Sequence, residues 1–138
     1  MILYLDENMP IHLAEGFQVL QNPEGLKTGK PVEVKYIPKE YGYGTQDLDW
    51  IPEIGNEKAC VIIQDLNIQR RKHELELYRR NNIGIFFLRG ASKKQGLSVW
   101  QMVDTLAKNW LQIVDIIYRE KRPFAYQITL KGKMKQFD

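Results

Sequence analysis

The sequence predicts an α/β fold in which helices cover both faces of a central, mainly parallel β-sheet, forming a three-layer sandwich. Two observations lead to this prediction. Short, nearly unbroken apolar runs alternate along the chain with stretches whose apolar residues recur at helical spacing. Parallel strands are buried on both faces and therefore consist of such runs, and the connections between them are usually helices that pack on the sheet.

The strand predictions rest on apolar runs that are bounded by turn residues. We expect four strands of the main sheet at residues 2–5, 32–37, 59–63 and 83–88. The alternating segment 124–130 predicts an added edge strand, and a mobile basic tail with Lys131, Lys133 and Lys135 follows it. Either of these two features could dock a partner.

Four helices are predicted between and after these strands. Behind Pro10, which suits a first helical turn, Leu13, Phe17 and Leu20 recur at helical spacing. Segments 47–57 and 68–81 also have helical patterns, although Pro52 interrupts the first. The longest helix, about 97–121, carries an apolar stripe that serves as core or interface: Trp100, Val103, Leu106, Trp110, Val114 and Ile117.

Composition narrows the class of protein. With 138 residues, 43% of them hydrophobic, the chain can bury one sizeable core, so we expect a single domain over residues 1–138. The lone Cys60 can neither pair within the chain nor build a cysteine metal cluster, which favours a cytoplasmic protein. The amino terminus reaches Asp6 too soon for a signal peptide, and no apolar stretch approaches the ~20 residues of a membrane helix.

Three aspartates are expected at the same edge of the predicted sheet. Asp6 follows the first strand, Asp65 follows the third, and Asp47 begins the helix after the second. Sites in open parallel sheets lie at the carboxyl ends of the strands. These three acids therefore converge, although they are far apart in the sequence.

Each aspartate also has an alternative role. Asp47 and Asp65 precede helical stretches that they could cap, and Asp6 could belong to a polar turn before Pro10. Three carboxylates at one edge would repel each other unless a cation lay between them. Oxygen ligands without His or Cys suit Mg²⁺ or Mn²⁺, which retain waters and commonly meet a phosphate. The favoured interpretation is a divalent-metal site for phosphodiester chemistry.

Three motifs occur in order: ILYLDENMP at 2–10, GTQDLDWI at 44–51 and VIIQD at 61–65. Together they resemble the PIN-like domains related to VapC-type toxins, over about residues 1–88. The resemblance implies a Mg²⁺- or Mn²⁺-dependent endoribonuclease that acts on RNA, often the toxin of a toxin–antitoxin pair, with an antitoxin protein as partner. It implies catalytic metal ligands at Asp6, Asp47 and Asp65, with Glu7 and Asp49 as auxiliaries.

One segment departs from the pattern of this family. Many PIN nucleases have a further acid near the fourth strand, where residues 87–94 of this chain offer only hydroxyl and basic groups. A single ion, a shell completed by Asp49 or Glu7, and a catalytically silent nucleic-acid-binding or toxin-like module all remain open. A phosphoacceptor signalling domain is a further alternative, in which Asp65 would be the acceptor, but Lys93 lies too far beyond the fourth strand to be its usual lysine partner.

Positive charge is concentrated in the second half of the chain. Residues 1–65 hold 5 Lys/Arg against 11 Asp/Glu, whereas residues 66–138 hold 15 against 6. Some of these cations should emerge near the acidic edge, where they could hold an RNA backbone, the alternative being a solvated helix face. The candidates are Arg70, Arg71, Arg89, Lys93 and Lys94. The long helix could in addition form a homodimer.

Overall fold

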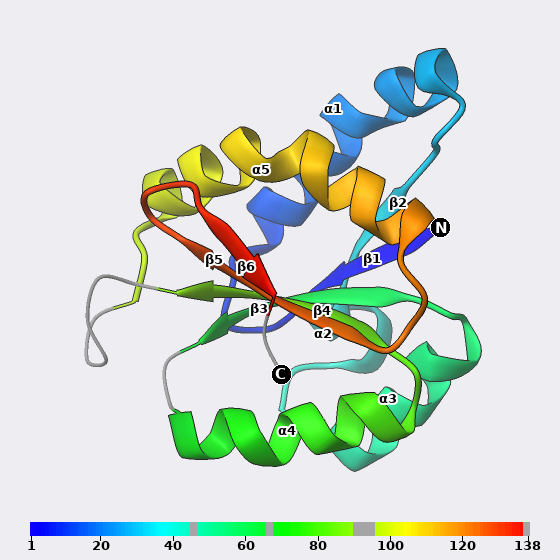
Figure 1. The fold of residues 1–138 in the computed structure, drawn as a ribbon, viewed down its shortest axis with the longest axis vertical. Helices are drawn as coiled ribbons and strands as arrows, with labels where there is room; N and C mark the ends of the chain where they lie inside the picture. The colour runs from blue at the N-terminus through cyan, green and yellow to red at the C-terminus, as the bar shows by residue number, and fades with distance from the viewer. Residues whose placement is uncertain (45–46, 66–67, 90–95, 137–138) are drawn as a thin grey trace.

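The computed structural model has three layers, a six-stranded sheet between two layers of helices (Figure 1). It describes residues 1–44, 47–65, 68–89 and 96–136, without the side chains of residues 47, 48, 65, 68–71 and 74. The α/β sandwich predicted from the sequence is confirmed. Within the described residues, no helix combines the length and apolar character needed to cross a membrane.

The sheet has the strand order β2-β1-β3-β4-β5-β6, in which the first five strands are parallel and β6 is antiparallel to β5. The four predicted strands of the main sheet are present, and their ends differ from the prediction by at most two residues. The strand bounds are Ile2–Leu5 (β1), Glu33–Tyr36 (β2), Cys60–Asp65 (β3), Gly84–Arg89 (β4), Phe124–Thr129 (β5) and Met134–Gln136 (β6).

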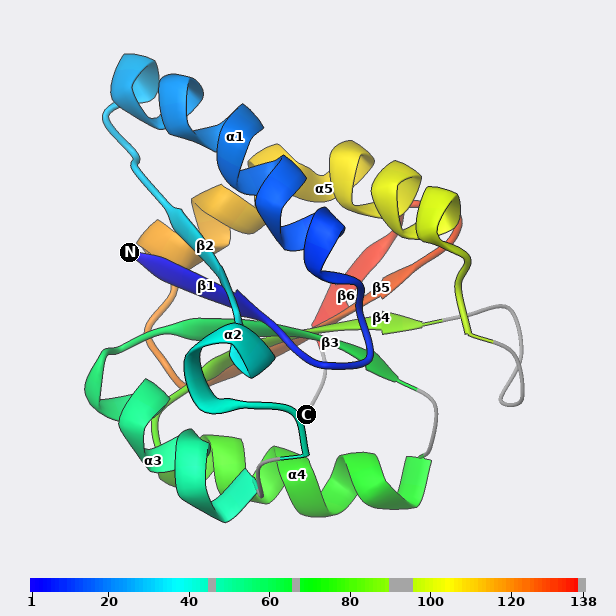
Figure 2. The same cartoon turned by 180° about the vertical axis from the view of Figure 1, so that it is seen from behind.

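Helices cover both faces of the sheet. One face carries α1 (Ile11–Thr28) and α5 (Val99–Arg119), and the other carries α3 (Asp47–Asn56) and α4 (Ile68–Arg80), as Figures 1 and 2 show. The short α2 (Ile37–Tyr41) directly follows β2.

The strands supply apolar side chains to both faces because successive residues of a strand point to opposite sides. Leu5 and Ile62 belong to the buried cluster beneath α1 and α5, whereas Tyr4 and Val61 belong to the cluster beneath α3 and α4. Burial on both sides explains why these strands appear in the sequence as nearly continuous apolar runs.

The carboxyl-terminal part of the sheet differs from the prediction. The strand predicted at 124–130 is present as β5, but it lies inside the sheet, between β4 and β6, so its predicted position at the edge is wrong. The expected basic tail instead turns back and adds β6. The amide of Thr129 donates to the carbonyl of Lys133 (3.1 Å), which closes the turn between the two strands.

The helices differ from the prediction in three details. α1 continues through Pro23 to Thr28 and ends at Gly29, whose φ of 72° suits a residue without a Cβ. α2 was not predicted, because Ile37 extends the apolar run of β2. On α5, Trp100 is 79% exposed and does not belong to the buried stripe.

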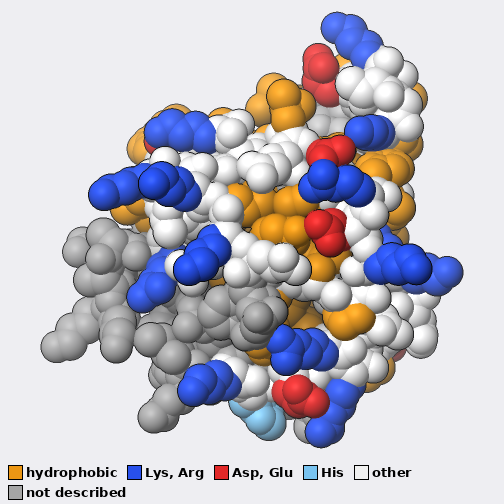
Figure 3. Space-filling view, viewed as in Figure 1, with side chains coloured by type: hydrophobic (Ala, Val, Ile, Leu, Met, Phe, Trp, Pro, Cys, Tyr) orange, Lys and Arg blue, Asp and Glu red, His pale blue; other side chains and the backbone are white. Residues whose placement is uncertain are grey.

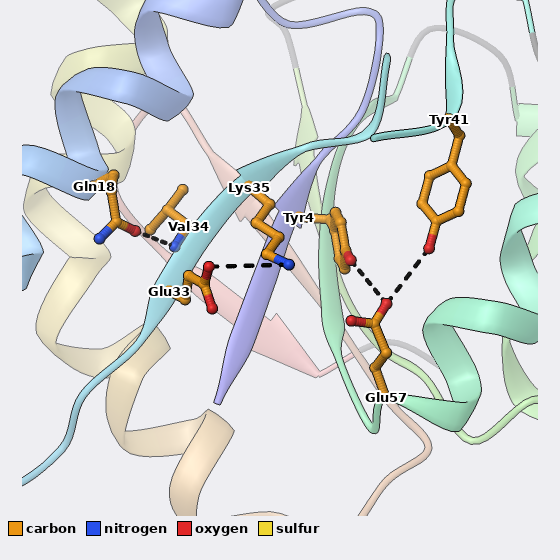
Figure 4. Close-up of polar contacts among 7 residues, drawn as sticks. All are labelled: Tyr4, Gln18, Glu33, Val34, Lys35, Tyr41 and Glu57. Carbon is orange, nitrogen blue, oxygen red and sulfur yellow. Dashed lines mark hydrogen bonds and ion pairs between the residues drawn. The ribbon is translucent and has the colours of Figure 1, made fainter. Parts of the chain in front are cut away.

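The strand β2 forms one edge of the sheet, and α1 protects part of it. Oε1 of Gln18 accepts a hydrogen bond from the amide of Val34, and Nζ of Lys35 lies 3.9 Å from Oε1 of Glu33 (Figure 4). An edge strand whose amide is already paired is a poorer template for another strand.

Candidate metal centre at the carboxyl edge of the sheet

The strand order changes direction between β1 and β3. The chain leaves β1 through α1 on one face of the sheet and leaves β3 towards α4 on the other face (Figure 1). In open α/β sheets this change creates a crevice outside the carboxyl ends of the two strands, and ligands bind there.

Two of the three predicted aspartates lie at this point of the fold. Asp6 follows β1, and its amide donates to the carbonyl of Ile62 in β3 (3.2 Å). Asp65 is the last residue of β3, and Asp47 is the first residue of α3. Because the side chains of Asp47 and Asp65 lie outside the described part, convergence of the three carboxylates remains a prediction.

The carboxylate of Asp6 is held by its own turn. Asp6 is only 9% exposed, and its Oδ1 accepts the backbone amide of Asn8 (3.2 Å) while its Oδ2 accepts the side-chain amide of Asn8 (3.5 Å). Such Asp-centred turns are a common way to fix a chain that leaves a strand. The orientation of this carboxylate is therefore set before any ligand binds.

Gln64 supports the same turn, although we had not predicted a role for it. Its side chain is buried at 7% exposure, its Nε2 donates to the carbonyl of Asn8 (3.1 Å), and its Oε1 accepts the amide of Leu97 (2.7 Å). The sequence indicates a special role only by placing a polar residue, Gln64, in the apolar run of β3 directly before Asp65. The partner of Gln64, Leu97, is too distant along the chain to be identified from the sequence.

Glu7 holds the loop that leads towards Asp47. Its Oε2 accepts the amide of Gly44 (3.1 Å). In the same region the rings of Tyr36 and Tyr43 meet edge to face with centroids 6.2 Å apart. Burial raises the pKa of Tyr36, and its hydrogen bond to Tyr43 and the nearby negative charges of Asp6 and Glu7 raise it further.

The described side chains do not by themselves form a complete cation site. Among them, no group of three or more His, Cys, Asp or Glu is arranged to hold a metal ion. Asp49, predicted as an auxiliary ligand, is exposed on α3, and Glu7 is engaged with the loop amide. Asp6 is thus the one predicted principal ligand with a described side chain. The chemistry of the predicted set, oxygen only, fits Mg²⁺ or Mn²⁺.

The predicted RNA-binding cations are described to different extents. Arg89 is exposed at the end of β4, and its backbone lies in register with Asp65 on one side and Thr129 on the other. Arg70 and Arg71 lie in the first turn of α4, but their side chains are outside the described part. Lys93 and Lys94 lie outside the described residues altogether.

The β5–β6 turn adds basic residues that were not assigned to this edge. Because β5 is parallel to β4, its carboxyl end and the turn after it lie at the same edge as Arg89. Lys131 and Lys133 are exposed there, and the side chain of Lys108 from α5 packs near Gly132. Figure 3 shows Lys and Arg side chains on this side of the molecule and on the opposite side as well, so the described cations are not confined to this edge.

Comparison with known proteins identifies the family of the segment that contains these residues. A family model described as PIN like domain matches residues 1–90, which include β1 to β4 and all three aspartates. No curated protein and no solved structure matches the chain significantly. The resemblance drawn from the three sequence motifs is thereby confirmed.

Proposed function

The chain belongs to the family of PIN-like domains, a family of nucleases, and on this premise we propose that it is a metal-dependent endoribonuclease. Asp6, Asp47 and Asp65 would hold Mg²⁺ or Mn²⁺. When bound there, such an ion would polarise a phosphate oxygen and activate the attacking water.

The observation that carries the proposal is the position of Asp6 and Asp65 at the carboxyl ends of adjacent parallel strands, where the strand order changes direction. Asn8 orients the Asp6 carboxylate, and Glu7 fixes the loop that precedes α3. Each residue therefore has a separate task. Asp6 supplies ligand oxygens, while its two successors in the sequence order the turn and the neighbouring loop.

The charge of the same edge supports a polyanion as the substrate. Arg89 and the two lysines of the β5–β6 turn are exposed beside the acidic positions. The two lysines lie after residue 90, outside the segment that the family model matches. Basic side chains around an acidic centre can hold the phosphates on either side of the bond to be cut. The family assignment, rather than the charge, favours RNA over other polyanions.

The decisive experiment is cleavage of a single-stranded RNA with Mn²⁺ by the parent and by Asp6→Asn. We expect the parent to cut, EDTA to stop the reaction, and Asp6→Asn to lose most of the activity. Asp104→Asn, which changes an exposed aspartate paired with Lys108 on α5, is the matched control and should cut normally. Equal activity of Asp6→Asn and the parent would contradict the proposed site.

A catalytically silent RNA-binding module is the second candidate. It is favoured by the end of β4, where Arg89 occupies a region in which many PIN nucleases have an acid. The same assay separates the two functions, because a silent module would bind RNA and leave it intact with Mn²⁺. A phosphoacceptor domain would instead be labelled transiently by a small phosphodonor.

The toxin role is a narrower form of the proposal. A small neighbouring gene that encodes a DNA-binding protein, and growth arrest on expression of the chain alone, would support it. Active nuclease without either feature would indicate a solitary enzyme.

A further inference from the structure

We infer that Gln64 is a positioning residue of the proposed metal site, which fixes the Asp6–Asn8 turn by joining it to the segment that enters α5. This inference rests on the proposed function, because it assigns a task at the same site. Gln64 itself need not touch metal or RNA.

The contacts form one continuous chain from α5 to the Asp6 carboxylate. The amide of Leu97 donates to Oε1 of Gln64 (2.7 Å), and Nε2 of Gln64 donates to the carbonyl of Asn8 (3.1 Å). Asn8 then donates from its backbone and its side chain to the two carboxylate oxygens of Asp6. A displacement of Gln64 would therefore be transmitted to the proposed ligand through Asn8.

Because the Gln64 side chain is buried, the loss of its two hydrogen bonds should matter more than the loss of exposed ones. Gln64 is 7% exposed, so water can replace its two hydrogen bonds only at a cost, and both ends of its amide group are used. Hydrogen-bond partners of metal ligands orient those ligands, and their replacement typically lowers metal affinity about 10- to 100-fold.

The hydrogen bond between Gln64 and Leu97 connects the proposed site to residues after 90, which the family model does not match. Leu97 lies beyond residues 1–90, immediately before Ser98, which caps α5 through a reciprocal pair of hydrogen bonds with Gln101. The start of α5 is therefore fixed, and Gln64 carries this rigidity across to the turn after β1. Residues after 90 would thus help to shape a site built from residues before 90.

The chain offers a closely matched control in Gln21. This glutamine is 5% exposed, its Nε2 donates to the carbonyl of Lys30 (3.4 Å), and its Oε1 accepts Nε1 of Trp110 (2.6 Å). It joins α1 to α5 away from the acidic edge. Gln64→Met and Gln21→Met thus remove comparable buried bonds while nearly keeping the side-chain volume.

The test measures Mn²⁺ affinity by the loss of the free-ion signal in electron paramagnetic resonance, and metal-free stability by urea unfolding. Both variants should unfold at lower urea concentration than the parent. Only Gln64→Met should bind Mn²⁺ more weakly, by up to about 10-fold, the lower end of the range for direct partners of a ligand, because Gln64 acts through Asn8. If either methionine variant fails to fold, Gln64→Asn and Gln21→Asn repeat the comparison with shorter polar side chains.

The outcomes separate this inference from the proposed function. Equal affinity of Gln64→Met and the parent, or an equal loss in the Gln21 variant, would overturn the positioning role alone. A parent that binds no Mn²⁺ at millimolar concentration would overturn the metal site and the positioning role together. Non-additive losses in a double variant with Asn8→Ala would support action through that residue.

Discussion

Asp65 is the residue at which a metal ligand and a helix cap are hardest to distinguish, because it ends β3 shortly before α4 begins at Ile68. Asp65→Asn separates the two roles, since asparagine has nearly the same shape and keeps an oxygen that can cap a helix. For a ligand, we expect loss of RNA cleavage and much weaker metal binding. The metal-free variant should be as stable as the parent or more stable, because one source of carboxylate repulsion is removed.

Cleavage with Mn²⁺ and urea unfolding without metal check this prediction on the same samples. Asp104→Asn again reports the effect of losing one exposed carboxylate elsewhere. Cleavage by Asp65→Asn at the parental rate would show that Asp65 is not a catalytic ligand.

Single residues were predictable when their role followed from the strand that precedes them. Asp6 follows an apolar run, so its place at the carboxyl edge could be deduced from the sequence. Gln64 could not be assigned in this way, because its role depends on Asn8 and Leu97, which only the folded chain brings to it. The Asp47 and Asp65 side chains lie outside the described part, so their predicted roles are unchanged.

Among the elements, α2 and β6 were missed for physical reasons. α2 has five residues and begins at Ile37, which continues the apolar pattern of β2, so no change of periodicity marks its start. β6 has three residues, including Lys135, and pairs with β5. Short elements depend more on tertiary partners than on their own sequence.

One polar contact joins three elements on the α3 side of the sheet. Oε1 of Glu57, after α3, accepts the hydroxyl of Tyr4 in β1 (2.8 Å) and that of Tyr41 in α2 (3.4 Å), as Figure 4 shows. Tyr4 is 1% exposed. Burial raises the pKa of Tyr4, and its hydrogen bond to Glu57 and the charges of Tyr41 and Glu57 raise it further.

This contact predicts a loss of stability at alkaline pH. Above the unfolded tyrosine pKa of about 10, the folded state still holds the Tyr4 proton while the unfolded state releases it. The free energy of unfolding should therefore fall as pH rises through this range. Tyr4→Phe should lower stability near neutral pH by about 1 kcal/mol, through the lost hydrogen bond, and make the alkaline fall shallower.

Urea unfolding of the parent and of Tyr4→Phe at several values between about pH 8 and 11 measures both effects. Some slope should remain in the variant, because burial also raises the pKa of Tyr36, Tyr41, Tyr118 and Tyr126. An identical pH dependence of the two proteins would mean that Tyr4 does not contribute to it.

At the scale of the whole molecule, the carboxyl edge combines acidic positions with cations from distant segments. The sequence predicted acidic positions at this edge, where the backbones of Asp6 and Asp65 lie, and it predicted Arg89 among the cations. It did not place Lys131 and Lys133 there, because their position depends on β5 running parallel to β4 and on the chain turning back into β6.

This arrangement predicts where the salt dependence of RNA binding originates. Arg89, Lys131 and Lys133 are exposed at the carboxyl edge, and a variant with all three replaced by Ala should bind single-stranded RNA more weakly. Each lost phosphate contact should reduce the slope of log affinity against log salt by about 0.7, so the triple variant should lose up to about 2. Fluorescence anisotropy with metal-free protein measures the slope without cleavage.

The control is a triple variant with the same change of charge at the other end of the strands, where the strands of the parallel sheet begin. Lys27 lies in the last turn of α1, Lys58 precedes β3 and Lys121 follows α5, and all three are exposed where strands begin. If RNA follows the proposed site, this variant should keep the parental slope, because its three lysines make no phosphate contact there. The loss of net charge is the same in both variants and therefore does not distinguish them. Equal losses of slope in the two triple variants would indicate diffuse attraction. An unchanged slope in the variant of Arg89, Lys131 and Lys133 would mean that these side chains do not contact RNA phosphates.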